Sequence, residues 1–428
     1  MKKFFMLFSA VLIGSPLVQA GGFMIGEMAT RSSGMASAFT AVSDDASAAW
    51  HNPAGVAFTE GSQIMVGGDV IFTSYSYRSN AATTGLGGAP VTNTANASKK
   101  TFVVPHAYFT YWDENSDLGA SLSINAPFGL ETDWPTTAAF SGKNTFSRIQ
   151  MVMLNPSVIF KLGERFSIAA GFDYGYINNV DLDNTVQRLN GNGGGWGGNA
   201  SIFYKGDGFN VGVTYRSRMK IDLDGNATAV AGGPLAGIGA TTTSASTSVT
   251  LPDQVNVGLA IMPSDQLTLS ADVDWVNWKT YDSIDIRYAS AAYRGAVSAI
   301  QGAIGAPVTG STSLPQNWKA TVAFRLGAEW KYNSEMRARL GYIFDPTPIK
   351  DADFSPSVPG NDRHIFSLGY GYDLNQNTTV DLGYAYVYFK DRNQTASPAT
   401  PPGSPNSVKN GLYEASVHIA MASLGYRF

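Results

Sequence analysis

Hydrophobic and polar side chains alternate with a period of two over most of the chain after residue 61. In the segment 363–372 the even positions are apolar or aromatic, and the odd positions are mostly small or polar. The same alternation recurs in the segments 255–261 and 380–388. This period predicts β-strands with one apolar face. Aromatic residues gather near the strand ends, which is typical of the two interfacial girdles of a membrane barrel.

About fourteen such strands are predicted, an even number as in bacterial outer-membrane barrels. They are expected near 62–77, 102–112, 117–126, 145–162, 166–178, 193–205, 208–218, 249–261, 266–276, 317–333, 336–344, 362–373, 377–389 and 414–428. Short turns alternate with long links, and the long links are 78–101, 127–144, 179–192, 219–248, 276–316, 345–361 and 390–413. A secreted array of β-sandwiches explains the alternation but not this rhythm. We therefore predict an all-β, transmembrane antiparallel barrel over residues 62–428.

The first twenty residues have the pattern of a signal peptide. Lys2 and Lys3 precede an apolar stretch over 4–17, and Ala20 completes a small-residue cleavage site. The alternative, an N-terminal membrane anchor, requires a longer apolar run than this one. No later stretch contains the ~18 apolar residues of a helical span. The protein is thus expected to be exported and to cross a membrane only as a barrel.

Composition agrees with a wall that faces lipid. Charged residues make up 14% of the chain, against ~25% in soluble domains. The mean hydropathy is only -0.06, because an alternating strand averages its two faces. A net charge of -4 disfavours a nucleic-acid partner. Cysteine is absent, which excludes disulfides, thiol nucleophiles and Cys-ligated metals. No cofactor and no metal site are predicted.

The segment 21–61 is rich in small residues and has neither a helical nor a strand period. We interpret it as a plug inside the barrel. Asn52, Pro53 and Ala54 are expected to form a turn that is hydrogen-bonded within the lumen. Asp44 and Asp45 are expected either to cap a short helix or to pair with Arg and Lys of the lumen.

The sequence Asp44-Asp45-Ala46 and the sequence Asn52-Pro53-Ala54, after Gly34, resemble the hatch signature of the FadL family of outer-membrane transporters for hydrophobic molecules. The resemblance extends over nearly the whole mature chain. The final Phe428 resembles the terminal aromatic that barrel-assembly machinery reads. The resemblance implies a monomer in the outer membrane of a Gram-negative bacterium, in contact with lipid and lipopolysaccharide, with hydrophobic small molecules as ligands.

One predicted strand is interrupted near its outer end, at Asn125, Ala126, Pro127, Phe128 and Gly129. Pro127 has no N–H to donate to the ladder, and Gly129 tolerates a bend. From the residues alone, Pro127 either starts the outer loop or leaves a gap in the wall. The resemblance implies the gap, because this strand kinks inward in the family and makes a lateral opening.

Alternation along 317–333 directs Lys319 and Arg325 towards the lumen, and both are candidate ligand-binding residues. The segment 318–327 resembles the family strand whose lysine faces the ligand carboxylate, which implies that role for Lys319. The second cation of the family is an arginine after the fifth strand, and Arg188 is the only candidate, displaced by a few residues. Phe23 is the first apolar residue after cleavage. In the family this terminus reaches the ligand pocket; the alternative is a frayed terminus.

The leading hypothesis is passive uptake of long-chain fatty acids with lateral exit, and the alternative is uptake of aromatic hydrocarbons. An outer-membrane lipid enzyme needs a nucleophile and a base in contact. The chain has four histidines, and none is placed by sequence beside a suitable serine or acid. A general porin needs a wide aqueous lumen, which a plug of about forty residues contradicts. We therefore predict a transporter and no enzyme.

Overall fold

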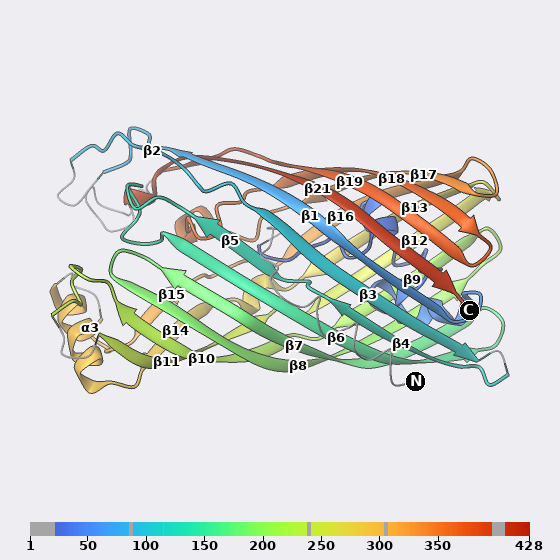
Figure 1. The fold of residues 1–428 in the computed structure, drawn as a ribbon, viewed down its shortest axis with the longest axis horizontal. Coiled ribbons are helices and arrows are strands. Elements are labelled where there is room, and N and C mark those ends of the chain that lie inside the picture. Colours follow the sequence, from blue (N-terminus) through green and yellow to red (C-terminus); the bar gives the residue numbers. More distant parts are fainter. Residues whose placement is uncertain (1–21, 85–88, 114, 238–240, 304–306, 396–406) are drawn as a thin grey trace.

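A single closed antiparallel barrel forms the wall of the molecule (Figure 1). The computed structural model describes residues 22–84, 89–113, 115–237, 241–303, 307–395 and 407–428. The predicted signal peptide, residues 1–20, lies outside the described residues. Strand β1 (Gln63–Arg78) pairs along its whole length with β21 (Gly411–Arg427), which closes the sheet.

Fourteen antiparallel staves make up the described wall, which confirms the predicted number, and some of them consist of two successive strands. In order they are β1; β3 (Thr101–Asp113); β4 (Leu118–Asn125) with β5 (Gly129–Asp133); β6 (Phe146–Leu162); β7 (Phe166–Asp183); β8 (Gln187–Lys205); β9 (Phe209–Arg216) with β10 (Met219–Ala229); β11 (Thr242–Leu251) with β12 (Gln254–Ser264); β13 (Leu267–Val276) with β14 (Ser283–Tyr288); β16 (Thr321–Lys331); β17 (Met336–Asp345); β18 (Arg363–Asn375); β19 (Thr378–Phe389); and β21. Three short strands, β2 (Thr94–Asn96), β15 (Thr312–Pro315) and β20 (Arg392–Gln394), lie at the end with the long links.

The apolar faces of the strands point outward, as the alternation predicts. Phe324, Leu326 and Phe366 are all more than half exposed, whereas their sequence neighbours Arg325 and Ser367 are buried. A wall that exposes apolar side chains outside and buries polar ones inside is the arrangement of a barrel in lipid.

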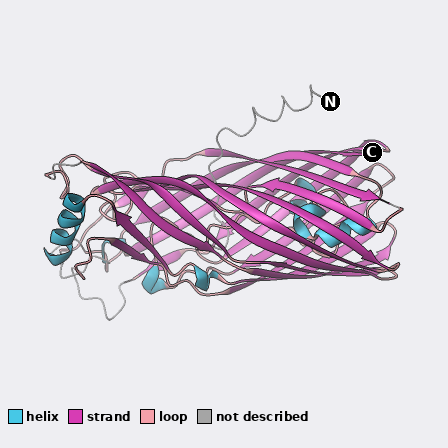
Figure 2. Cartoon of the chain, turned by 90° about the horizontal axis from the view of Figure 1, so that it is seen from below, coloured by secondary structure: helices cyan, strands magenta, loops and turns pink. Residues whose placement is uncertain are grey.

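Beyond the membrane band the polarity of the wall reverses. The link 219–248, predicted as a loop, contains β10 and β11 instead. Ile221 and Leu223 on β10 are buried, whereas Lys220, Asp222 and Asp224 are exposed. In water the polar side chains face outward and the apolar ones line the lumen. The link 276–316 likewise contains β14, β15 and helix α3 (Ala291–Ala303), which lies at the far end of the barrel (Figure 2).

The described residues before β1, 22–62, lie inside the barrel, in the half that contains the C-terminal end (Figure 2). They form α1 (Thr30–Gly34), α2 (Ala48–His51) and the 3-10 turn η2 (Pro53–Phe58), and nearly all of them are buried. Three further 3-10 turns are η3 (Trp278–Thr280), η4 (Asp351–Asp353) and η5 (Ser407–Lys409).

Within the described residues, none of the helices has the length and apolar character that a membrane crossing requires.

Candidate functional site: an outer cavity, an aromatic cluster and a gap in the wall

A network of ion pairs ties the hatch to the wall, and all of its members except Asp44 are buried or nearly so. Arg31 of α1 donates to Glu329 of β16 at 2.9 Å and to Asp44 at 2.6 Å. Arg339 of β17 donates to the same Glu329 at 2.6 Å and to Asp381 at 2.6 Å. Breaking a buried pair leaves an uncompensated charge, so these contacts hold the hatch in one position.

The two hatch aspartates reach the wall indirectly. Asp44 and Asp45 both pair with Arg31 of the hatch, at 2.6 and 3.1 Å. Asp45 also accepts from the backbone N–H of Ser47 at 2.8 Å, at the start of α2. Pairing with an arginine was expected, but the arginine belongs to the hatch and not to the lumen wall, and Arg31 then carries the link to Glu329.

Asn52 and Ala54 hydrogen-bond the hatch to β8. The Asn52 amide group donates to the carbonyl of Ile202 at 3.0 Å, and the N–H of Ala54 donates to the Ser201 hydroxyl at 3.0 Å. Pro53 begins η2, where its missing N–H costs no hydrogen bond. These residues therefore hold a turn against the lumen wall.

Gly34 marks a close approach between hatch and wall. A Cβ at Gly34 would lie 2.9 Å from the Cα of Gly369 on β18, so only glycine fits at this contact. On β13, three staves along the wall from β18, a carboxylate oxygen of Asp272 accepts from the backbone N–H groups of Phe39 and Thr40, at 3.0 and 2.9 Å. The hatch is thus anchored on several sides of the lumen.

The hydrogen-bond ladder of the wall has a gap between β3 and β5. β4 pairs with both β3 and β6 and ends at Asn125, whereas β5 pairs with β6 alone. Among the described residues, positions 101–106 of β3 pair with β1 on one side and with no strand on the other. The interruption lies at Ala126, Pro127 and Phe128, the segment for which the family resemblance implied a gap and the residues alone left a gap or a loop start open. A side exit requires such a gap.

The first described residues cover this gap from inside. The N–H of Ile25 donates to the carbonyl of Pro127, and the N–H of Gly129 donates to the carbonyl of Phe23, both at 2.8 Å. Met24 and Phe128 form an antiparallel β-bridge. The segment 23–25 therefore acts as a short extra strand and is ordered by backbone hydrogen bonds.

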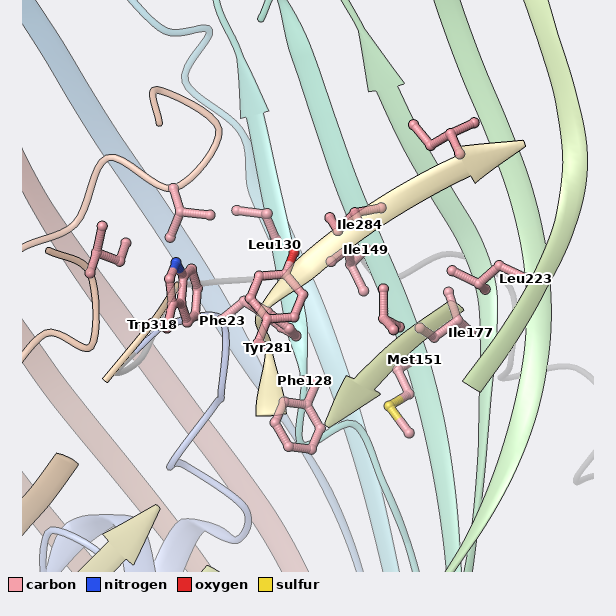
Figure 3. Packing of buried hydrophobic residues seen from close by; sticks show 14 of the residues in the cluster. Phe23, Phe128, Leu130, Ile149, Met151, Ile177, Leu223, Tyr281, Ile284 and Trp318 are labelled. Carbon is pink, nitrogen blue, oxygen red and sulfur yellow. The ribbon is translucent and has the colours of Figure 1, made fainter. Parts of the chain in front are cut away.

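Phe23 is the centre of an aromatic cluster (Figure 3). Its ring centroid lies 5.1 Å from those of Trp278 and Tyr281, 5.8 Å from that of Trp318 and 5.9 Å from that of Phe128. All five side chains are buried. Edge-to-face rings at such distances attract one another beyond the area that they bury, so this cluster stabilises the covered state of the gap.

An apolar cavity of about 440 Å³ adjoins the cluster on the side of the long links. Tyr281 and Leu130 belong to the lining of the cavity and to the same hydrophobic core as Phe23 (Figure 3). The apolar lining consists of Leu130, Ile149, Ile177, Val180, Leu182, Leu189, Leu223, Val249, Tyr281, Ile284, Ile286, Leu314, Phe354 and Val358. A cavity of this size and lining suits a hydrophobic small molecule.

Three cations also line this cavity. Arg148 is paired with Asp181 at 2.8 Å. Lys143 and Lys409 form no ion pair with any described residue, and the Lys409 ammonium donates only to the backbone carbonyl of Phe354. Burial, assisted by the nearby Lys143 charge and partly opposed by the carboxylate of Asp353, lowers the pKa of Lys409 to about 8. Sequence reasoning missed both lysines, because each lies in a link without periodicity.

The three cations that the sequence singled out lie elsewhere. Lys319 precedes β16 and is exposed, and Arg188 is exposed on β8; neither lines the cavity. Trp318 occupies the buried position next to Lys319. Arg325 does point into the lumen, where it pairs with Asp274 and donates to the hatch carbonyl of Ala36 at 3.2 Å. Its contacts are those of a hatch anchor.

No group of three or more His, Asp or Glu side chains among the described residues is arranged to hold a metal ion. A closed barrel with an apolar exterior, an internal hatch and an apolar cavity defines the class: an outer-membrane transport barrel.

Comparison with known proteins leads to the same class of outer-membrane transport barrels. Residues 11–428 match the family model described as outer membrane protein transport protein (OMPP1/FadL/TodX), and the chain belongs to this family. The protein is thus an outer-membrane β-barrel of a family of transporters for hydrophobic substrates.

Individual relatives are similar over most of their length. The long-chain fatty acid transport protein of Escherichia coli K12 is 26% identical, over 89% of this chain and 90% of its own. The solved FadL homologue of Pseudomonas aeruginosa has a TM-score of 0.77 at 18% identity, covering 96% of this chain and 100% of its own. The Ralstonia pickettii toluene transporter TbuX has a TM-score of 0.62 at 18% identity, covering 90% and 94%. The two solved structures show the fold alone.

Proposed function

We propose that this protein takes up long-chain fatty acids passively. The observation that carries the proposal is the outer cavity, in which an apolar lining meets two lysines, Lys143 and Lys409, without an ion pair among the described residues. A desolvated ammonium gains a partner when a carboxylate binds, and charge-assisted hydrogen bonds are the strong ones. The acyl chain then lies among the apolar side chains. The fatty acid transport protein of Escherichia coli K12 supports the same substrate class.

The cavity, the aromatic cluster around Phe23 and the gap beside β3 form one route. In this proposal cargo passes from the cavity towards Phe23, the segment 22–25 leaves Pro127 and Gly129, and the cargo moves sideways into lipid. The hatch anchors from Arg31 onward stay in place, because their buried ion pairs are costly to break. Lys143 and Lys409 take the carboxylate role that sequence reasoning assigned to Lys319 and Arg188.

Uptake of aromatic hydrocarbons is the second candidate. The toluene transporter TbuX has the same fold, and the aromatic cluster around Phe23 offers edge-to-face contacts to a benzene ring. A hydrocarbon needs no cation, so the two lysines separate the two candidates.

The test is displacement of a fluorescent fatty acid from the detergent-purified protein by oleate and by toluene. The variants are Lys143→Met with Lys409→Met, and Lys319→Met as the matched control. We expect oleate to bind about ten- to hundredfold more weakly to the double variant, because it loses charge-assisted hydrogen bonds. Toluene binding and the Lys319→Met variant should be unchanged. Loss of oleate binding in Lys319→Met alone would return the carboxylate to Lys319, and displacement by toluene only would favour the hydrocarbon channel.

A further inference from the structure

A cluster of buried polar side chains lies on the lumen side of the wall gap. Its members are Asp69 on β1, His106 on β3, Asn125 at the end of β4, and Glu27 of the N-terminal segment, and none is more than 4% exposed. Among the described residues, both ring nitrogens of His106, both carboxylate oxygens of Asp69 and both amide atoms of Asn125 lack a hydrogen bond of ordinary geometry. The Tyr108 hydroxyl donates its proton to the Met28 carbonyl and lies close enough to Asn125 for its oxygen to accept from the Asn125 amide, which leaves the amide oxygen of Asn125 and both ring nitrogens of His106 to bind a ligand.

The strand register places this cluster at the corner of the gap. The ladder between β3 and β4 runs as far as Ala107 and Ile124, so His106 and Asn125 are the next residues beyond it. His106 lies opposite Gly67 of β1, where any side chain would collide with the imidazole ring. Gly67 therefore leaves room for the imidazole ring of His106 directly beside the gap in the wall.

Such groups are costly to bury without partners, and native proteins rarely do so away from a functional site. His106 and Asn125 can each donate and accept a hydrogen bond. A protonated carboxylic acid offers one donor and an acceptor, and an alcohol does the same, so either head group satisfies them. A hydrocarbon satisfies neither.

The charges around the cluster disfavour an anionic head group. Asp69 and Glu27 face the same space, and neither forms an ion pair among the described residues. The nearby cation is Arg325, beside Gly26, and its guanidinium is engaged by Asp274 and by the Ala36 carbonyl. A carboxylate head would be buried beside two carboxyl groups with no cation free to pair with it among the described residues, whereas an uncharged head needs no counter-charge. Leaving water also favours the protonated form of the cargo itself.

We propose that Asn125 and His106 form an exit site, which hydrogen-bonds the uncharged polar head of a departing fatty acid or long-chain alcohol while its tail enters the lipid through the gap. The inference rests on the proposed function and adds a second binding site to it. The outer cavity binds the carboxylate form, and the exit site binds the neutral form.

The experiment measures uptake of oleate, oleyl alcohol and toluene into proteoliposomes by the full mature chain. The test variant carries Asn125→Leu and His106→Phe, and the single variant Asn125→Leu serves if the double one does not assemble. We expect uptake of oleate and of oleyl alcohol to fall about tenfold, the loss of one or two hydrogen bonds. Uptake of toluene, and displacement of the fluorescent fatty acid from the outer cavity, should stay as in the wild type.

Thr110→Val is the matched control. Thr110 is on the same strand, fully buried, and its hydroxyl also lacks a partner, but its backbone pairs with strands on both sides. This variant should transport all three cargoes normally. Undiminished uptake of oleate and the alcohol by the test variant would overturn the exit site, as would an equal loss of toluene uptake, which means a damaged gap. If the wild type does not bind oleate, the proposed function fails instead, and the alcohol still tests the exit site.

Discussion

Lys409 shows how a single side chain couples the fold to the charge of a ligand. The residue lies in η5, half-buried at the outer cavity, and donates to a backbone carbonyl and not to an acid. Its pKa is lowered to about 8, mainly because burial penalises the charged form and also because Lys143 is near. An anion that binds here stabilises the ammonium, so binding and protonation are linked.

The first prediction follows from the sign of this shift. Below about pH 8 Lys409 is charged, and oleate should bind tightly. Above this pH the ammonium loses its proton, and the affinity for oleate should fall about tenfold at one pH unit above the pKa of Lys409. The measurement is oleate displacement between about pH 6.5 and about pH 9.5, where the carboxyl group of the ligand stays ionised. Lys409→Met should remove this transition. A variant that keeps the wild-type profile would exclude Lys409 as its source.

At the scale of elements, the N-terminal segment and the broken strand complete one another. β4 and β5 leave backbone groups unpaired at 126–128, and the segment 23–25 supplies two backbone hydrogen bonds and a bridge there. Unpaired backbone groups are costly to bury, and here the segment 23–25 supplies the missing hydrogen-bond partners. Because the contact is short, it can be broken without unfolding the barrel.

A disulfide across this bridge should lock the gap. Residues at an antiparallel bridge lie within disulfide distance, and the chain has no cysteine of its own. With Met24→Cys and Phe128→Cys together, we expect uptake of oleate to be nearly abolished after oxidation and restored by a reductant. The single variants control for the loss of each side chain. Equal uptake in the oxidised and reduced forms, with the disulfide verified by mass spectrometry, would show that the segment need not leave the kink.

At the scale of the whole molecule, the hatch turns an open barrel into a closed one. Small residues pack the hatch, and buried ion pairs from Arg31 and Arg339 join it to β16, β17 and β19. Apolar cargo can leave through the gap in the wall without crossing the hatch. Ions that cross the whole barrel have to pass the buried ion pairs of Arg31 and Arg339.

The wild-type barrel should therefore show no steady ion conductance in a planar bilayer. Arg339→Met leaves Asp381 without this arginine and Glu329 with Arg31 alone, which costs about 3–5 kcal/mol, so transient openings should appear. Arg165→Met removes a pair with Asp207 that is exposed to solvent and therefore weak, and this variant should stay silent. A large steady conductance of the wild type would mean that the hatch leaves an aqueous pore.

The strand period and the turn rhythm are local features, and the sequence alone was enough to predict what depends on them. Alternating side chains such as Phe324, Arg325 and Leu326 define the two faces of a strand whatever lies next to it, so the barrel and its number of staves were predictable. At Pro127 the residues alone allowed either a gap or the start of a loop, because the missing N–H shows where pairing stops but not whether the neighbouring strand continues. The alternation rule failed at the end with the long links, where Ile221 and Leu223 face the lumen and the polarity reverses.

The ligand cavity was decided by tertiary structure. Lys143 and Lys409 are separated by more than half of the chain and meet only because two links fold over the same lumen. Lys319 follows the buried Trp318 and turns to solvent, which no pattern in its own segment indicates. A period of two reports which side of the wall a residue faces, but charge pairing across the lumen depends on distances between strands and links that are far apart in sequence.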